Sequence, residues 1–464
     1  MKKEKRRSNS KLVGGSQLAV INPRVAGIDI GSREMFVCGS ANREGRREVR
    51  VFATTTQQIL ECVRWLKEQN VESAALESTG VYWIPVLEIL ESQGVSTLLV
   101  DPGPLSRVPG RSEKTDSSDC QWIQTLHSHG LLNGSFRPSE PVGELRTIVR
   151  QKTTLMREQG DWIRRMQKCL DQMNVRVHHA VTQTQGATGM AILRAIVAGE
   201  RDARKLAALR DPGCQKSETE MVELLTGHWR ADHLFNLKQH MMMYDTVSSQ
   251  LAVYEQEIQR RMQELTPSGR KETEVPAVAK PAKQRTIKRR GQEARRQALY
   301  RMIGADLTSI DGIGVETAEV IISEYGIDMS KFPSEKEFAK HVGLVPSRPV
   351  SGGKVLKKKA RKARKSTRTA DVLRNAASAL KNSHSAIGSY FRRIARRIDA
   401  GVAVFATARK LAEMVYRMLR YGQAYVDQGQ AAYEKQYEAT RLRAIKSTAK
   451  QLGYDLVKQE AATA

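Results

Sequence analysis

Cysteine is scarce in this sequence. Only five of its 464 residues are cysteine, namely Cys38, Cys62, Cys120, Cys169 and Cys214. They lie far apart and form no CxxC pair, so the sequence indicates neither a disulfide framework nor a structural zinc site. We therefore expect a protein of the reducing cytoplasm.

Long apolar runs are missing too. No stretch approaches the roughly 20 apolar residues of a membrane span, and the basic start, MKKEKRRSNSKLVGG, is not followed by an apolar run. Acidic residues are outnumbered, with 50 Asp and Glu against 76 Lys and Arg, which gives a formal net charge of +26. Such an excess favours a polyanionic partner. We expect that partner to be nucleic acid, and we expect no membrane partner.

Residues 24–137 have the pattern of an α/β domain. Three short β-rich runs, VAGIDI, MFVCG and EVRVFA, are separated by turn residues and predict an antiparallel meander. Helical spacing in TTTQQILECVRWLKEQN and VYWIPVLEILESQG predicts two helices, followed by the strands SAALE and STLLV respectively. Three antiparallel strands and then alternating helices and strands are the order of a ribonuclease-H-like domain.

Four carboxylates are expected to meet in this domain. Asp29 lies in the first strand and Glu77 ends the fourth, its neighbour in that topology, while Asp116 and Asp119 share one face of the next helix. Clustered carboxylates suit Mg²⁺ or Mn²⁺, and a pair of such ions can activate an attacking oxygen in phosphodiester displacement. The plainer alternative is that the two helical aspartates only complement the helix dipole, with Thr115 or Asp116 as N-cap.

The segment AGIDIGS also resembles the first phosphate loop of actin-like ATPases and sugar kinases. That alternative requires another glycine-rich phosphate loop later in the chain. The sequence DPGP, at Asp101 to Pro104, fits this role poorly because its prolines lack a backbone donor.

The middle of the chain is expected to be helical. In residues 138–265 apolar side chains step by three and four over several turns, which is typical of a coiled-coil arm that mediates self-association. Residues 266–300 contain proline, have few large apolar residues and are strongly basic. They predict a basic linker, which either contacts phosphates or is a solvated tether. We expect residues 1–23 to be a basic N-terminal tail and 423–464 a C-terminal helical tail.

Residues 301–422 are expected to form a mostly α-helical domain that binds DNA. The segment IDGIGVETA matches a helix-hairpin-helix turn, in which Gly312 and Gly314 allow close approach and the next helix start binds a phosphate. An ordinary αα-hairpin is the alternative. The basic run that follows should neutralise phosphates and make binding salt-sensitive. Its expected contacts are Arg348, Lys354, Lys357, Lys358, Lys359, Arg361 and Lys362.

Ser351 stands in PVSGGK, where a serine before two glycines is ordinarily part of a flexible turn. The segments GIDIG, LESTG, KTDSSD, IDGIGVETA and FAKHVGLVPS lie in the same chain. With them the sequence resembles transposases of the insertion sequence 110 family, the DEDD transposases or bridge-RNA-guided recombinases. The similarity is co-linear from about Arg24 to Gly422. Many relatives carry a second serine where this chain has Lys354, so Ser351 is the less ambiguous match.

The resemblance implies a RuvC-like catalytic domain in which Asp29, Glu77, Asp116 and Asp119 form an acidic tetrad that binds Mg²⁺ or Mn²⁺. It also implies that Ser351, in the transposase domain, attacks DNA and forms a covalent phosphoserine. Donor and target double-stranded DNA would be selected by a structured noncoding bridge RNA. The enzyme would work as a homo-oligomer, a dimer or tetramer, in the cytoplasm of bacteria or archaea in association with the nucleoid.

Two other functions fit parts of the pattern. A metal-dependent, structure-selective nuclease like a Holliday-junction resolvase would use the same four carboxylates with water as the nucleophile and would not need the serine. A nonenzymatic nucleic-acid-binding protein would keep the acidic cluster only as structure. A covalent protein–DNA adduct separates the first alternative from a recombinase, and metal-dependent strand cleavage excludes the second.

Overall fold

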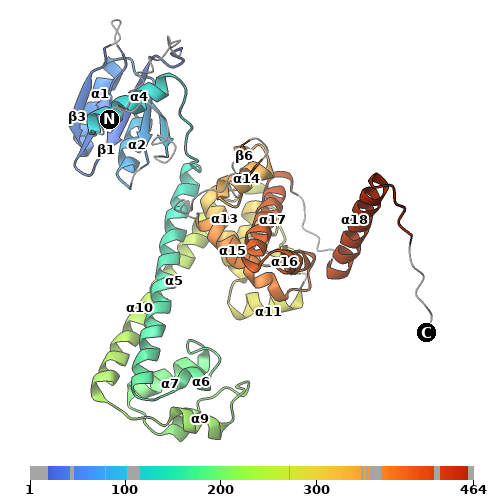
Figure 1. The fold of residues 1–464 in the computed structure, drawn as a ribbon. Coiled ribbons are helices and arrows are strands. Elements are labelled where there is room, and N and C mark those ends of the chain that lie inside the picture. The colour runs from blue at the N-terminus through green and yellow to red at the C-terminus, as the bar shows by residue number, and fades with distance from the viewer. Residues whose placement is uncertain are drawn as a thin grey trace, which may run out of the picture. The chain divides into compact units, whose positions relative to one another are not determined.

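The computed structural model divides the chain into two compact units, Met1–Arg137 and Pro138–Ala464 (Figure 1). The residues it describes are 19–41, 46–78, 80–101, 115–270, 272–278, 280–345, 350–351, 354–355, 367–422 and 429–457. In these described ranges no helix is both long enough and apolar enough to cross a membrane.

A mixed five-stranded sheet forms the centre of the first unit. Its order is β3-β2-β1-β4-β5, in which β1, β2 and β3 pair antiparallel while β4 lies parallel to both β1 and β5. The strands are β1 (Val25–Ile30), β2 (Glu34–Cys38), β3 (Val49–Ala53), β4 (Ser73–Glu77) and β5 (Ser96–Val100). The predicted meander, the two strands after it and the mixed sheet are confirmed.

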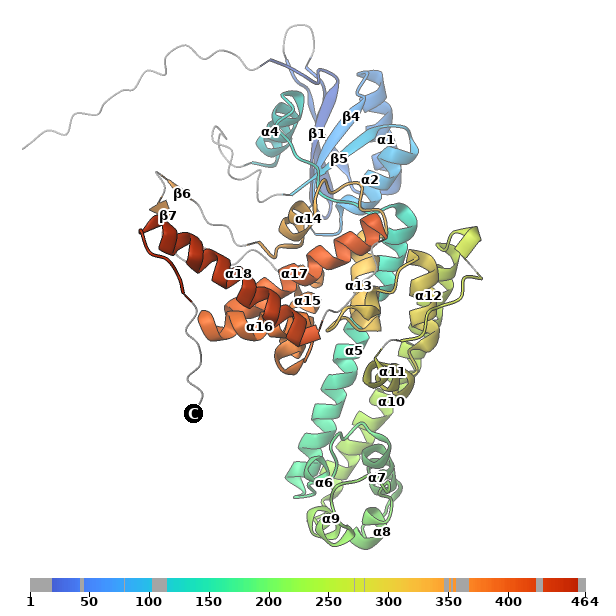
Figure 2. The same cartoon turned by 90° about the vertical axis from the view of Figure 1, so that its right-hand side faces the viewer.

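Helices cover both faces of this sheet. On one face α1 (Thr56–Glu68) and α2 (Trp83–Ser92) bury Leu66 and Leu87 against strand residues such as Ile28. On the other face lies α4 (Asp116–Ser128), whose apolar side chains pack on alternate residues of the strands. Figure 2 shows α4 and α1 on opposite sides of the strands. The face that a strand residue takes therefore decides which helix it meets.

Two long helices begin the second unit. In it α5 (Glu140–Gln172) and α10 (Ala231–Glu264) pack along each other, as Figure 1 shows. α10 buries apolar side chains at positions spread along its length, including Leu237, Val247 and Ile258. Four short helices share an apolar core with the C-terminal end of α5 and the N-terminal end of α10. They are α6 (Val177–Ala180), α7 (Ala187–Ala198), α8 (Ala203–Ala207) and α9 (Glu218–Leu225).

The rest of the second unit is almost entirely helical. It comprises η1 (Ser268–Arg270), α11 (Pro281–Arg289), α12 (Glu293–Ile303), η2 (Leu307–Ser309), α13 (Val315–Tyr325), α14 (Glu335–Val342), the two-residue strands β6 (Val350–Ser351) and β7 (Lys354–Val355), α15 (Arg368–Ala379), η3 (Leu380–Asn382), α16 (Ala386–Arg397), α17 (Ala400–Tyr421) and α18 (Gly429–Gln451). The last helix, α18, packs on α16, where the guanidinium of Arg393 lies 4.1 Å from the ring centroid of Tyr437.

Where the sequence predicts a linker, the structure has α11 and α12. The reason is that α12 buries its arginines in ion pairs inside the unit. The Arg295 side chain is 8% exposed and pairs with Glu319 of α13 and Glu255 of α10. Arg296 is equally buried and pairs with Asp306 at 2.6 Å. These two arginines are therefore taken up by the protein interior and are not available to phosphates.

The same ion pairs tie the long helices to α13. Lys152 of α5 lies 2.8 Å from Glu319, and both side chains are less than 5% exposed. Arg295 Nε donates to the other oxygen of Glu319 at 3.0 Å. One buried carboxylate thus pairs with two buried cations from two helices. Removal of any one of these three charges would leave the others buried without full compensation.

Candidate active site

Strand alternation brings Asp29 and Glu77 to the face that α4 covers. Gly27 contacts the backbone of α4, and Asp29 lies two residues further along the same strand. Ala75 packs with Ile123 of α4, and Glu77 lies two residues beyond Ala75. Since side chains two apart share a face, both carboxylates belong to the α4 side of adjacent parallel strands.

Gly27 sets how closely α4 approaches the sheet. A Cβ placed on Gly27 would lie 2.3 Å from the Cys120 carbonyl oxygen and 2.3 Å from the Gln124 backbone nitrogen. Only a residue without a side chain fits between strand and helix here. In the sequence, Gly27 is notable only as part of the segment GIDIG. The available signal was a glycine in a buried strand, two residues before a candidate carboxylate.

At the N-terminus of α4, Thr115 and Ser118 do the capping. Thr115 Oγ1 accepts from the Ser118 backbone N–H at 3.2 Å, and Ser118 Oγ accepts from the Thr115 N–H at 3.0 Å. This is a reciprocal capping box. Asp116 and Asp119 lie in the first turn but supply none of these capping bonds. Capping therefore does not explain why two aspartates stand there, although both complement the helix dipole.

The electrostatics of Asp29 link the four carboxylates. The pKa of Asp29 is raised to about 6 by burial first, and then by the negative charges of Glu77, Asp119 and Asp116 in that order. A hydrogen bond from the Ile30 backbone N–H opposes the shift. Each of the other three predicted carboxylates thus acts on Asp29. The fold brings the four into one electrostatic neighbourhood.

The donor chemistry of this neighbourhood suits a hard divalent cation. Carboxylate oxygens are the ligands that Mg²⁺ and Mn²⁺ prefer, and a cation would relieve the repulsion that raises the pKa of Asp29. In the conformation described here, no three Asp, Glu, His or Cys side chains among the described residues form a metal-binding group. The residue types therefore fit a divalent metal, while the described positions do not form a closed ligand set.

The segment AGIDIGS forms β1 and the turn into β2. Gly31 donates its N–H to the Glu34 carbonyl at 2.9 Å, which closes the β1–β2 turn. The second phosphate loop that a kinase requires would have to be DPGP, and of that segment only Asp101 lies within the described residues.

Ser351 lies in a short hairpin. β6 and β7 pair antiparallel, and the backbone of Ser351 stands opposite that of Lys354. The two glycines between them lie outside the described residues. So do the other predicted basic contacts: Arg348, Lys357, Lys358, Lys359, Arg361 and Lys362.

The predicted helix-hairpin-helix turn joins η2 to α13. Gly312 has φ +85°, and a Cβ there would lie 2.9 Å from the Ala376 carbonyl oxygen of α15, so this glycine is needed for the internal packing. Gly314 is the N-cap of α13 and has no side chain to bond the first-turn N–H groups. Those groups can face a phosphate, although Glu316 in the same turn adds a negative charge.

Two lysines contact this turn, Lys280 at the N-cap of α11 and Lys283 within α11, and neither stands out in the sequence. Lys283 Nζ donates to the Ile310 carbonyl at 2.9 Å, and Lys280 Nζ lies 2.6 Å from Asp311 Oδ2. Both stand in the segment predicted to be a linker. Its basic composition was the only signal, and it could not show which of the lysines fold back onto the turn.

Comparison with known families finds matches in two separate parts of the chain. Residues 26–175 match a family described as transposase, that of the DEDD transposases of the IS110 group, and residues 304–392 match the family described as transposase IS116/IS110/IS902. No match to a curated protein was found. DEDD transposase domains have a ribonuclease-H-like fold and typically use a divalent metal, in keeping with the mixed sheet and the carboxylates. The chain belongs to the IS110 family of transposases, enzymes of insertion sequences that cut and rejoin DNA.

Proposed function

We propose that this transposase is an RNA-guided recombinase that cuts and rejoins DNA with an acidic tetrad and a serine nucleophile. The tetrad consists of Asp29, Glu77, Asp116 and Asp119. The observation that carries the tetrad is that Asp29 and Glu77 lie on the α4 side of adjacent strands, where burial and the other three carboxylates raise the pKa of Asp29 to about 6. Perturbation by several like charges at one position is typical of functional sites.

In this proposal the tetrad holds Mg²⁺ or Mn²⁺. When bound, such an ion neutralises charge on the scissile phosphate and on the leaving oxygen. The protein's own contribution is to position the four carboxylates on β1, β4 and α4. Burial of Asp29 is unfavourable for its ionised form without a cation, so the site favours the metal-bound state.

Ser351 is the proposed nucleophile. Its Oγ attacks a DNA phosphorus, the Oγ–P bond forms, the bond to one strand oxygen breaks, and that strand end leaves as a hydroxyl. A hydroxyl of the partner DNA then attacks the phosphoserine, which restores the serine and seals the new strand. The serine loses its proton in the first step and regains it in the second, so the cycle is balanced.

The proposed partners are donor and target double-stranded DNA and a structured noncoding bridge RNA that selects them. The net charge of +26 supports binding to two kinds of polyanion. Self-association through α5 and α10 would give the homo-oligomer. We place the enzyme in the bacterial or archaeal cytoplasm, at the nucleoid. If the RNA that copurifies with the protein, once sequenced, contains no discrete structured species, guidance by RNA is wrong.

A metal titration of strand cleavage tests the tetrad. Asp29→Asn and Asp119→Asn should each lower Mg²⁺-dependent cleavage by the full-length protein roughly 100-fold. The matched control is Glu72→Gln, because Glu72 is an exposed carboxylate just before β4, at the opposite end of that strand from Glu77. Wild-type cleavage by either Asp variant across the Mg²⁺ range would exclude the tetrad.

A further inference from the structure

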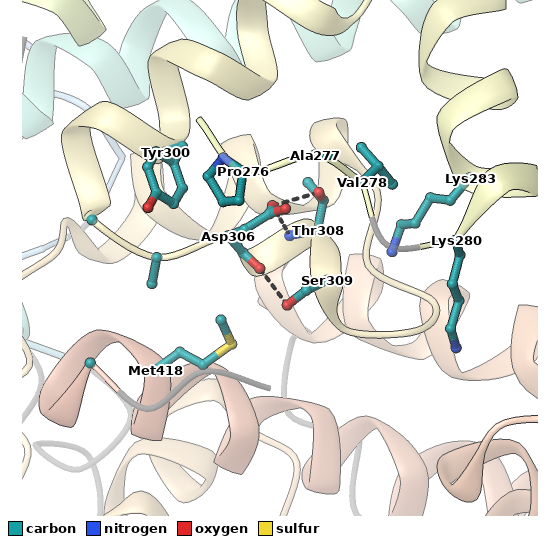
Figure 3. Close-up of a pocket in the computed structure, with 13 residues that line it drawn as sticks. Pro276, Ala277, Val278, Lys280, Lys283, Tyr300, Asp306, Thr308, Ser309 and Met418 are labelled. Atoms are coloured by element: carbon teal, nitrogen blue, oxygen red, sulfur yellow. Dashed lines mark hydrogen bonds between the residues drawn. The ribbon is translucent and has the colours of Figure 1, made fainter. Parts of the chain in front are cut away.

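The second unit contains a cavity of about 310 Å³ beside the helix-hairpin-helix turn (Figure 3). Its walls come from Pro276–Val278, α11, the end of α12, η2 and the end of α17. None of its lining residues belongs to the tetrad or to the β6–β7 hairpin. The cavity is therefore a separate feature, built largely from the segment in which the sequence predicts a linker.

The two ends of the cavity differ in chemistry. In the view of Figure 3, Tyr300, Pro276 and Met418 stand at one end, and Lys280 and Lys283 stand at the other. An aromatic ring, a proline ring and a thioether form a surface on which a flat apolar ring can stack. At the other end Lys280 is paired with Asp311, and Lys283 is the lysine that can donate to an anion.

The lysine end keeps positive charge in a partly desolvated place. Lys283 is largely buried, and burial is the main reason that its pKa falls to about 8, while Asp311 and Asp306 oppose the fall. Its Nζ donates to the Ile310 carbonyl at 2.9 Å. An ammonium group has three donors, so this bond leaves Lys283 able to donate further. An anion beside it would strengthen its charged form.

The acidic residue on the wall is already neutralised. Asp306 Oδ2 pairs with Arg296 at 2.6 Å, and its Oδ1 accepts from the Thr308 N–H at 3.0 Å and from the Thr308 hydroxyl at 2.6 Å. These bonds hold its charge against Arg296 and the start of η2. Asp306 therefore offers little repulsion to an anion at the lysine end.

We infer that this cavity binds one unstacked nucleotide of a single-stranded nucleic acid, with the base against Tyr300, Pro276 and Met418 and a phosphate at Lys283, beside the Lys280–Asp311 ion pair. The volume lies at the small end of the range for ligand pockets, roughly 300–1,000 Å³, which suits one nucleotide and excludes a duplex. Aromatic stacking plus a cationic rim is the usual way to hold single strands. This site does not depend on the proposed tetrad or serine.

Photocrosslinking of the full-length protein tests the inference. The probes are two single strands of one sequence, an RNA that carries 4-thiouridine and a DNA that carries 4-thiothymidine, and mass spectrometry locates the crosslinked residues. The expected crosslinks are to Tyr300 or Met418. Ala305→Phe, which fills the cavity without changing charge, should lower their yield about tenfold, as loss of one stacked base implies.

Charge variants on α11 separate the cavity from general electrostatics. Lys283→Gln should weaken the same crosslinks, whereas Lys288→Gln removes the same charge from an exposed position of the helix and should leave them unchanged. Crosslinking of either probe to Tyr300 or Met418 supports the site. The probe that crosslinks more strongly shows whether the bound nucleotide belongs to RNA or to DNA.

Two results would overturn the inference. One is a wild-type crosslink map that contains neither Tyr300 nor Met418. The other is an undiminished yield in a folded Ala305→Phe protein. If thermal unfolding shows that Ala305→Phe is not folded, the wild-type map and the pair of α11 variants decide the question without it.

Discussion

Gly27 of β1 and Gln124 of α4 touch through their backbones. A Cβ on Gly27 would lie 2.3 Å from the Gln124 nitrogen and 2.9 Å from its Cα. The side chain of Gln124 also reaches back to the Val25 carbonyl, 3.4 Å away. This contact fixes the distance between β1, which carries Asp29, and the helix that carries Asp116 and Asp119.

Substitution of Gly27 should therefore damage the catalytic domain. Gly27→Ala forces α4 away from β1, which should cost about 1–3 kcal/mol of unfolding free energy. Displaced aspartates should also lower strand cleavage by the folded protein roughly 100-fold. The control is Gly143→Ala, because a Cβ at Gly143 in α5 meets no atom within 4 Å. Equal cleavage by the two variants would show that the close contact is dispensable.

The raised pKa of Asp29 predicts a pH-dependent gain from Asp29→Asn in metal-free protein. The folded-state value of about 6 exceeds the ordinary 3.8, so the folded state binds this proton more tightly. The free energy by which Asp29 destabilises the folded state is therefore small near pH 4, grows until about pH 6 and is constant above it. At pH 8 the variant should be more stable by roughly 1 kcal/mol, after allowance for solvent screening.

Thermal unfolding in EDTA at pH 4.5 and pH 8 measures this gain. Added Mg²⁺ should stabilise the wild type more than Asp29→Asn, because only the wild type regains a compensated carboxylate. A gain that is the same at both pH values would mean that the charge of Asp29 is not the cause.

The buried pair of cations around Glu319 predicts a large stability effect. Glu319→Gln leaves Lys152 and Arg295 buried with less compensation, which should cost about 3 kcal/mol in urea unfolding. Glu264→Gln is the control, because Glu264 forms an exposed pair with Arg260 and should change stability by less than about 0.5 kcal/mol. Similar losses in the two variants would contradict this account.

The basic run after Ser351 should hold phosphates and not read bases. Changing Lys357, Lys358 and Lys359 to Gln should weaken binding to unrelated DNA sequences about equally. The slope of the logarithm of the binding constant against the logarithm of the salt concentration should become shallower by about 0.9 per lost contact. A control with three lysines changed elsewhere, Lys67, Lys168 and Lys205, should keep the wild-type slope. Loss of preference for one sequence at an unchanged slope would argue for base contacts.

Much of the first unit could be predicted because its signals are local. Alternating and helical periods, with turn residues between them, specify the strands, the helices and their order. The face shared by Asp29, Glu77 and α4 follows from strand alternation once the order is known. The sequence limited the N-cap of α4 to Thr115 or Asp116. It could not decide between them, because the choice depends on the hydrogen bond that the Ser118 hydroxyl accepts from the Thr115 N–H.

The segment after the long helices could not be predicted, because its stability is nonlocal. Arg295 and Arg296 suggest a solvated linker until their partners Glu319 and Asp306 are known. Composition carries no information about such pairing across tens of residues. For the same reason the contacts of Lys280 and Lys283 with the hairpin turn could not be predicted, because they depend on how α11 packs against that turn.

A covalent protein–DNA adduct tests the central claim most directly. Full-length protein with its copurified RNA is mixed with labelled donor and target DNA and Mg²⁺ and then denatured, and mass spectrometry locates the modified residue. The account predicts a phosphoserine link at Ser351, which Ser351→Ala abolishes while RNA and DNA binding remain and Ser347→Ala leaves intact. An adduct that persists in Ser351→Ala, or metal-dependent cleavage with no adduct in either protein, would contradict it, and the latter result would establish water as the nucleophile.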